Sequence, residues 1–152
     1  MMPDEEAPRL GVNRDLILQR IQEIRQALDL LRTDTAGAQS AFLADARMVD
    51  AAKYRLLVAI EAAVSICTHV ASHVAMRTPS SYADCFEMLG SAGIVSTDLA
   101  ERLGRMARFR NRLVHLYWKV DNERLWQLLT ESLGDLDDYL KQIGALVAEG
   151  HA

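Results

Sequence analysis

The 152-residue chain is 50% hydrophobic and 25% charged, with 17 basic and 21 acidic residues. This composition provides enough apolar surface for one folded domain and excludes a wholly disordered chain. Eight glycines and three prolines are too few for the frequent turns of a sheet protein, so an all-α fold is favoured.

The chain also lacks the signals of secreted and membrane proteins. Its first ten residues are acidic, unlike a signal peptide, and no uninterrupted apolar stretch approaches the roughly 18 residues of a membrane span. The two cysteines, Cys67 and Cys85, form no disulfide or metal framework. We therefore expect a cytoplasmic protein without a membrane partner.

The spacing of apolar residues predicts a helix near the N-terminus and a long second one. The first runs from about Asn13, a predicted N-cap, to Arg32, with apolar residues three and four apart. The second runs from about Ser40 to Met76 and ends before Pro79. Two apolar rows on this helix predict that it lies at the centre of a bundle.

Three further helices follow. Ser81 opens a short one with Asp84 in a capping box, Ser96 opens the next, and Asp121 caps the last. The short connections favour antiparallel neighbours, so we predict an antiparallel bundle of about five helices.

We expect this bundle to be a single domain. It spans residues 13–148, preceded by a flexible segment over residues 1–12 and followed by a frayed tail over residues 149–152.

Charge is unevenly distributed along the chain. Between Glu101 and Lys119 there are six basic residues and one acidic residue, whereas the rest of the chain carries 11 basic and 20 acidic residues. A basic segment on an acidic body is typical of an anion-binding surface. A solvated helix face is the alternative explanation.

Within this segment, Arg110 and His115 are the two types of side chain that RNA cleavage without a metal would require. Cleavage requires proton transfer at the 2′-hydroxyl and at the leaving 5′-oxygen, and the ordinary pKa of histidine, about 6.5, suits both. Arginine is permanently charged and matches the charge that develops on the phosphate.

The two residues lie about 140° apart around a regular helix. They can converge if the helix is broken, if the arginine reaches around, or if two chains each contribute. No other convincing acid–base residue lies nearby in the sequence, so we favour a homodimer whose two copies of His115 meet at a twofold axis.

The motif Arg110-x4-His115-x-Tyr117, with Asn111 after the arginine, resembles the signature of HEPN ribonucleases, and its tyrosine is the mark of their HepT-like toxin branch. The segments YRLLVAIEAAVSICTHVAS, PSSYADCFEMLGSAGIV and RMARFRNRLVHLYWKVD are also similar to that branch, so the resemblance spans about residues 14–143.

The resemblance implies a HEPN-like bundle that acts as a homodimeric, metal-independent endoribonuclease toxin, with Arg110 and His115 catalytic and RNA, not DNA, as substrate. It also implies an MntA-like nucleotidyltransferase antitoxin that transfers AMP from ATP to Tyr117. A modified Tyr117 would place negative charge beside the catalytic pair. Neither the RNA target, tRNA or messenger, nor the number of AMP units follows from the sequence.

The other residues of the segment have simpler roles. Arg108, Asn111, Arg112 and Lys119 are candidate RNA-binding residues. Trp118 is expected to pack in the core in preference to stacking on a base.

Outside the segment, the sequence offers little further chemistry. His69 and His73 lack a third ligand, so we expect neither metal nor cofactor, and Glu61 has no assigned role. The competing hypothesis is a non-catalytic HEPN-like partner module for a nucleotidyltransferase.

Overall fold

The computed structural model describes residues 11–74 and 77–148 and consists of helices joined by short connections. In chain order they are α1 (Arg14–Asp34), α2 (Gln39–Ala44), α3 (Ala46–Val74), α4 (Tyr82–Ser91), α5 (Thr97–His115), the 3₁₀ turn η1 (Tyr117–Lys119), α6 (Asn122–Glu131) and α7 (Gly134–Ala148). No strand occurs among the described residues, so the predicted all-α class is confirmed. The predicted tails over residues 1–10 and 149–152 lie outside the described residues.

Two of the five predicted helices are divided in the structure. Asp45 has an extended backbone and its carboxylate accepts a hydrogen bond from the Met48 N–H at 3.1 Å, which starts α3 afresh after α2. Ser132 and Leu133 likewise separate α6 from α7. The apolar spacing continues across both breaks, and this is why periodicity alone predicted continuous helices.

The predicted N-caps are confirmed. The side chains of Asn13, Ser81, Ser96 and Asp121 each accept a hydrogen bond from a backbone N–H in the first turn of their helix. The capping box at Ser81 is only half formed, because Asp84 accepts from the Ser80 N–H at 2.8 Å instead of the Ser81 N–H.

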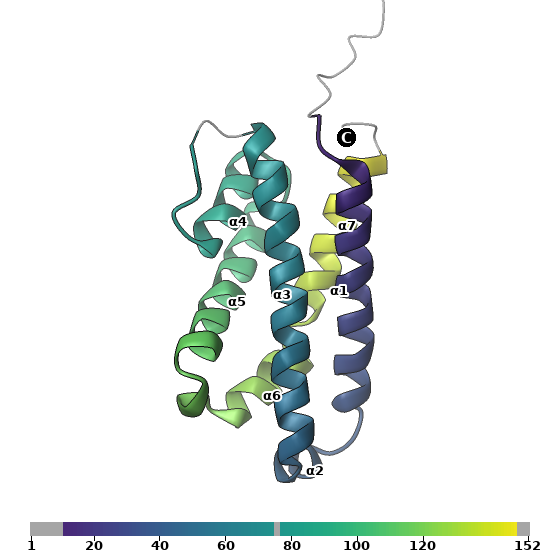
Figure 1. The fold of residues 1–152 in the computed structure, drawn as a ribbon, viewed down its shortest axis with the longest axis vertical. Helices are drawn as coiled ribbons and strands as arrows, with labels where there is room; N and C mark the ends of the chain where they lie inside the picture. Colours follow the sequence, from purple (N-terminus) through teal and green to yellow (C-terminus); the bar gives the residue numbers. More distant parts are fainter. Residues whose placement is uncertain (1–10, 75–76, 149–152) are drawn as a thin grey trace, which may run out of the picture.

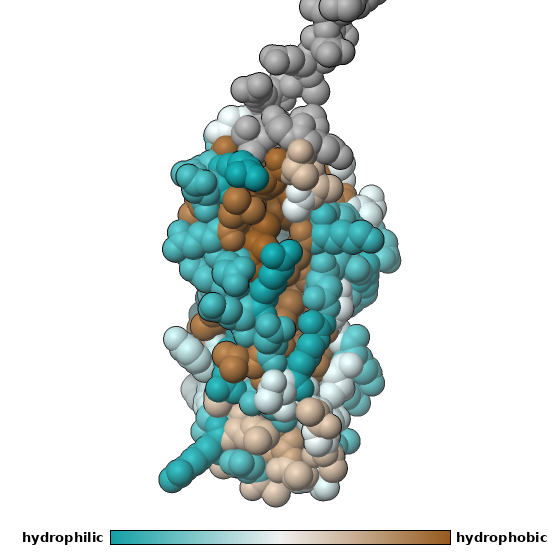
Figure 2. All heavy atoms as spheres, turned by 90° about the vertical axis from the view of Figure 1, so that its right-hand side faces the viewer, coloured by the Kyte–Doolittle hydropathy of each residue, from teal (hydrophilic) through white to brown (hydrophobic). Residues whose placement is uncertain are grey.

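Helix α3 is the central element of the bundle. It lies between α1 and α7 on one side and α4 and α5 on the other (Figure 1), and its buried residues come from more than one face. Although α3 is long and apolar enough to cross a membrane, half of its most apolar window is buried inside the protein, as expected for a core helix. On the α1 side of the molecule, hydrophilic side chains flank a narrow band of apolar ones (Figure 2).

Two polar contacts tie outer segments to α3. The hydroxyl of the fully buried Tyr139 on α7 donates to the Ala63 carbonyl at 2.9 Å. Six residues further along α3, His69 Nε2 accepts a hydrogen bond from the backbone N–H of Asn13 at 2.7 Å, and the neighbouring Val12 is buried in the core. The packed domain therefore includes Val12, which the sequence placed in the flexible segment.

Helices α4 and α5 approach each other closely at Gly90. A Cβ atom at this position would lie 2.8 Å from the Ala100 Cβ. Ala100 is buried on α5. The missing side chain at Gly90 and the short one at Ala100 therefore set the distance between the two helices. This contact orients the helix that carries the basic segment.

We predict that Gly90→Ala lowers the free energy of unfolding by about 1–3 kcal/mol because α4 and α5 must move apart. Gly144→Ala on α7 is the control. A Cβ there meets nothing within 4 Å, so better helix propensity should stabilise the protein by up to about 1 kcal/mol. Urea unfolding of both variants measures this, and equal stability of the two would contradict it.

Candidate functional site

Helix α5 is continuous from Thr97 to His115, so it contains both Arg110 and His115 in one regular helix. A break between them is therefore excluded as the way in which they converge. Helix geometry keeps the two about 140° apart around the axis.

The side chain of Arg110 is held against α3 and α4. Its Nε donates to Glu61 Oε1 at 2.7 Å, and its Nη1 donates to Asn111 Oδ1 at 3.2 Å. The guanidinium carbon also lies 4.7 Å from the centre of the Tyr82 ring, a cation–π distance. These three contacts fix the guanidinium on the α3–α4 side of α5.

Glu61 uses its second oxygen to hold Tyr82. The Tyr82 hydroxyl donates to Glu61 Oε2 at 3.0 Å. Burial of the phenol, together with this bond, raises the pKa of Tyr82, so the hydroxyl stays a donor at neutral pH. Glu61, which the sequence left unassigned, therefore joins α3, α4 and α5 at one point.

His115 lies at the end of α5 and is exposed. The last helical hydrogen bond follows it, from the Leu116 N–H to the Arg112 carbonyl at 2.8 Å. Within the described chain, no hydrogen bond joins His115 to Arg110 or to Glu61. The imidazole is therefore open to an incoming ligand.

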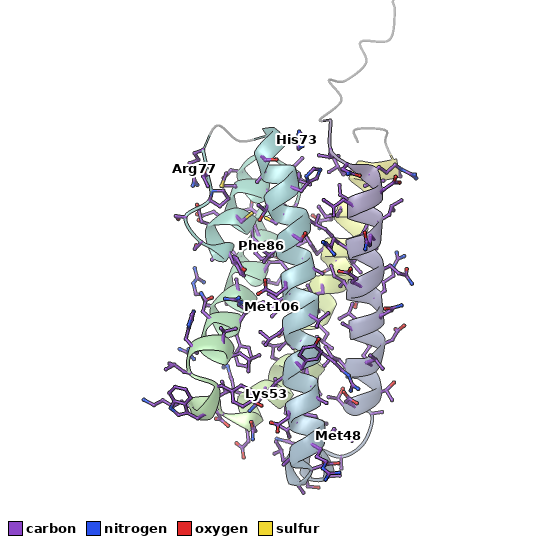
Figure 3. The ribbon with its side chains drawn as sticks, viewed as in Figure 1. Met48, Lys53, His73, Arg77, Phe86 and Met106 are labelled. Atoms are coloured by element: carbon purple, nitrogen blue, oxygen red, sulfur yellow. The ribbon has the colours of Figure 1, made fainter. Side chains whose placement is uncertain are left out.

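Tyr117 is half-exposed in the η1 turn that follows α5 and contacts α3. Its hydroxyl donates to Asp50 Oδ1 at 2.7 Å. The Lys53 ammonium lies 4.3 Å from the centre of its ring, and the Lys53 side chain extends from α3 toward the lower end of α5 (Figure 3). The bond to Asp50, with burial and the nearby negative charge, raises the pKa of Tyr117.

The prediction that Trp118 packs in the core is wrong. Its side chain is 77% exposed. The η1 turn begins after the helix has ended at His115, so the helical spacing that would carry residue 118 back toward the core no longer applies.

The basic residues of α5 divide into two groups. Arg102 is paired with Asp98, Asp135 and Asp138, and Arg110 is paired with Glu61. In the part of the chain that the structure describes, no ion pair involves the exposed side chains of Arg105, Arg108, Arg112 and Lys119.

The first three of these share a face of α5 with His115. Positions 105, 108, 112 and 115 follow the alternating spacing of three and four that marks a single helix face. Arg110 lies on the opposite side of the helix.

The described residues contain no group of three metal-ligating side chains. His69 accepts its bond from Asn13, and its ring centre lies 4.9 Å from that of His73. Burial and the neighbouring His73 lower the pKa of His69. Cys67 and Cys85 are free and buried.

The residues that sequence reasoning missed are on α3 and α4. Asp50, Lys53 and Tyr82 were not considered, and Glu61 had no partner. One signal was present: Lys53 falls on the apolar row of a core helix and is only 6% exposed. A charged residue in such a row must find a partner across the fold.

Comparison with known proteins identifies the family of the chain. The family described as Ribonuclease HepT-like matches residues 17–143. The chain belongs to the HepT-like ribonuclease family.

Two individual relatives are named as nucleases. The mRNA nuclease HepT of Shewanella oneidensis is 24% identical over 131 residues, which cover 86% of this chain and 98% of that protein. The tRNA nuclease HepT of Aphanizomenon flos-aquae is 27% identical over 85 residues, covering 56% of this chain and 58% of that one.

A solved structure shares the fold. The tri-AMPylated HEPN toxin of Shewanella oneidensis, in complex with its MNT antitoxin, superposes with a TM-score of 0.79 at 24% sequence identity, covering 86% of this chain and 98% of that chain. The predicted HEPN-like bundle is thereby confirmed.

We predict that Asp50→Ala lowers the pKa of Tyr117 toward the ordinary tyrosine value. The substitution removes the acceptor that stabilises the neutral phenol and the negative charge that opposes ionisation, and both changes act in the same direction. A ¹³C NMR titration of labelled tyrosine measures it, with the Tyr82 resonance as internal control. An unchanged Tyr117 titration would show that the bond to Asp50 does not form in solution.

Proposed function

We propose that this protein is a metal-independent endoribonuclease toxin that acts in the cytoplasm with Arg110 and His115 as its catalytic residues. The observation that carries the proposal is the fixed guanidinium of Arg110 on the same helix as an open imidazole. Membership of the HepT-like ribonuclease family supports ribonuclease activity.

The chemistry is transesterification. The 2′-oxygen attacks the adjacent phosphorus, the bond from phosphorus to the 5′-oxygen breaks, and the products are a 2′,3′-cyclic phosphate and a 5′-hydroxyl. His115 transfers protons at the two oxygens, and Arg110 stabilises the negative charge on the phosphorane. Because the reaction requires a 2′-hydroxyl, DNA is not cut.

A homodimer accounts for the positions of the two groups. Glu61 and Tyr82 hold Arg110 on the side of α5 that faces away from the exposed cations and His115. The arginine is thus restrained from reaching around its own helix. A second copy across a twofold axis would bring its own His115 to this arginine.

RNA is bound by the exposed cations on the His115 face. Arg108, Arg112 and Lys119 contact phosphates along the strand, because arginine and lysine without protein partners are free to replace counterions. Asn111 orients Arg110 through its side-chain oxygen and contacts the RNA beside it.

Tyr117 is the acceptor of AMP from a nucleotidyltransferase antitoxin of the MntA type. Its oxygen bonds to the α-phosphorus of ATP, the α–β phosphoanhydride bond breaks, and pyrophosphate and a proton leave. Support comes from the half-exposed side chain of Tyr117, two residues from His115, and from the tri-AMPylated relative bound to its antitoxin. The added phosphate competes with RNA for the site.

We predict that His115→Ala lowers the cleavage of total RNA, assayed in EDTA, by at least about 10²-fold, since acid–base catalysis is worth about 10²–10⁴. His73→Ala, at an exposed histidine on the far end of α3, is the matched control and should cleave at the wild-type rate. Intact RNA with the wild-type protein would instead support a non-catalytic partner module.

The proposed homodimer, in which Arg110 and His115 of one site come from different chains, leads to a second prediction. Arg110→Ala and His115→Ala chains are inactive alone, but unfolding and refolding them together should restore part of the activity, because the mixed dimer contains one copy of each group at one axis. Two wild-type chains treated in the same way serve as the reference. Absence of any recovery would show that each chain uses its own pair.

A further inference from the structure

The contact between the η1 turn and α3 involves side chains that the proposed cleavage reaction does not use. Asp50 and Lys53 lie three residues apart on α3, and both contact Tyr117. Asp50 accepts a hydrogen bond from its hydroxyl, and the Lys53 ammonium lies over its ring. Lys53 is buried and Asp50 is exposed, so the contact reaches from the core to the surface. We call these three residues the latch.

The latch restrains the segment that follows His115. Tyr117 begins η1, whose own hydrogen bond runs from the Lys119 N–H to the Leu116 carbonyl at 2.8 Å. Only Leu116 separates the latch from His115. The residues on either side of Tyr117, Leu116 and Trp118, are exposed and do not pack in the core. Without the latch, these two side chains would therefore not hold the segment that follows α5.

Helix ends fray unless later contacts hold them. A displacement of a catalytic group by about 1 Å can lower the reaction rate on the order of 100-fold. A restraint two residues beyond His115 therefore affects catalysis even though it touches no reacting atom.

We propose that Asp50 is a positioning residue of the site: by accepting the Tyr117 hydroxyl, it holds η1 against α3 and so fixes the imidazole of His115. The inference rests on the proposed role of His115 in cleavage. Lys53 contributes by holding the aromatic ring at the cation–π distance.

The latch also gives AMP transfer to Tyr117 a second effect. Transfer replaces the hydroxyl proton by a phosphodiester, so the donor to Asp50 is lost. The new negative charge then lies beside a carboxylate, and like charges repel at this range. Modification thus opens the latch as well as occupying the site.

The test compares Asp50→Ala, Asp50→Asn, Tyr117→Phe and the double variant Asp50→Ala/Tyr117→Phe in RNA cleavage. Asp50→Ala and Tyr117→Phe should each lower kcat roughly tenfold with KM within about twofold, since positioning is lost and RNA contacts remain. The double variant should be no slower than the slower single variant, because both remove the same bond. Asp50→Asn keeps an acceptor oxygen and should retain most of the activity.

Hydrogen exchange provides a readout that does not depend on cleavage. Asp50→Ala and Tyr117→Phe should speed exchange of the amides at residues 116–120 by about tenfold, whereas Asp29→Ala, at an exposed aspartate on α1, should change neither exchange nor kcat.

The outcomes separate the two proposals. Unchanged exchange in Asp50→Ala overturns the latch. Faster exchange with wild-type kcat overturns the positioning of His115. A wild-type protein that leaves RNA intact refutes the ribonuclease and the catalytic part of this inference together, while the exchange result still decides whether the latch exists.

Discussion

Glu61 joins the three helices of the site through its two carboxylate oxygens, one accepting from Arg110 on α5 and the other from Tyr82 on α4. Its side chain is 43% exposed, so the ion pair with Arg110 contributes at most about 1 kcal/mol to stability. The buried helix contacts contribute far more to folding. The importance of Glu61 is therefore positional: together with Tyr82 and Asn111, it fixes the direction of the Arg110 guanidinium.

That fixed direction constrains how the site is assembled. Arg110 faces α3 and α4, whereas the exposed arginines share the opposite face with His115. In the proposed reaction, one helix therefore presents the group that stabilises the phosphate on one side and the group that transfers protons on the other. The proposed symmetric pair of chains would satisfy both orientations, because each chain would supply the group that faces away from the site in the other.

Local features of this fold could be predicted from sequence, because they depend on neighbouring residues. The N-caps at Asn13, Ser96 and Asp121 form as expected, since each needs only a side chain and the next turn of backbone. The division of the fifth predicted helix at Ser132 was not foreseen, because the apolar spacing continues through it. Trp118 was misplaced for a related reason, since helical periodicity was extended beyond the end of α5.

The motif residues of the site were predicted, but their partners were not. Arg110 and Glu61 are 49 residues apart, and Tyr117 and Asp50 are 67 apart. Counting charges along the chain does not identify Glu61 as the partner of Arg110, because such a count ignores neighbours brought together by folding. These contacts form because α3 packs against α5. No local pattern in a single sequence indicates that packing.

The most direct measurement of the central claim is a crystal structure with an RNA oligonucleotide that carries a 2′-deoxy sugar at the cleavage position. The account predicts that the scissile phosphate lies within hydrogen-bond distance of the Arg110 guanidinium and of a His115 imidazole, with the two groups coming from different chains. A phosphate bound away from both groups would contradict it.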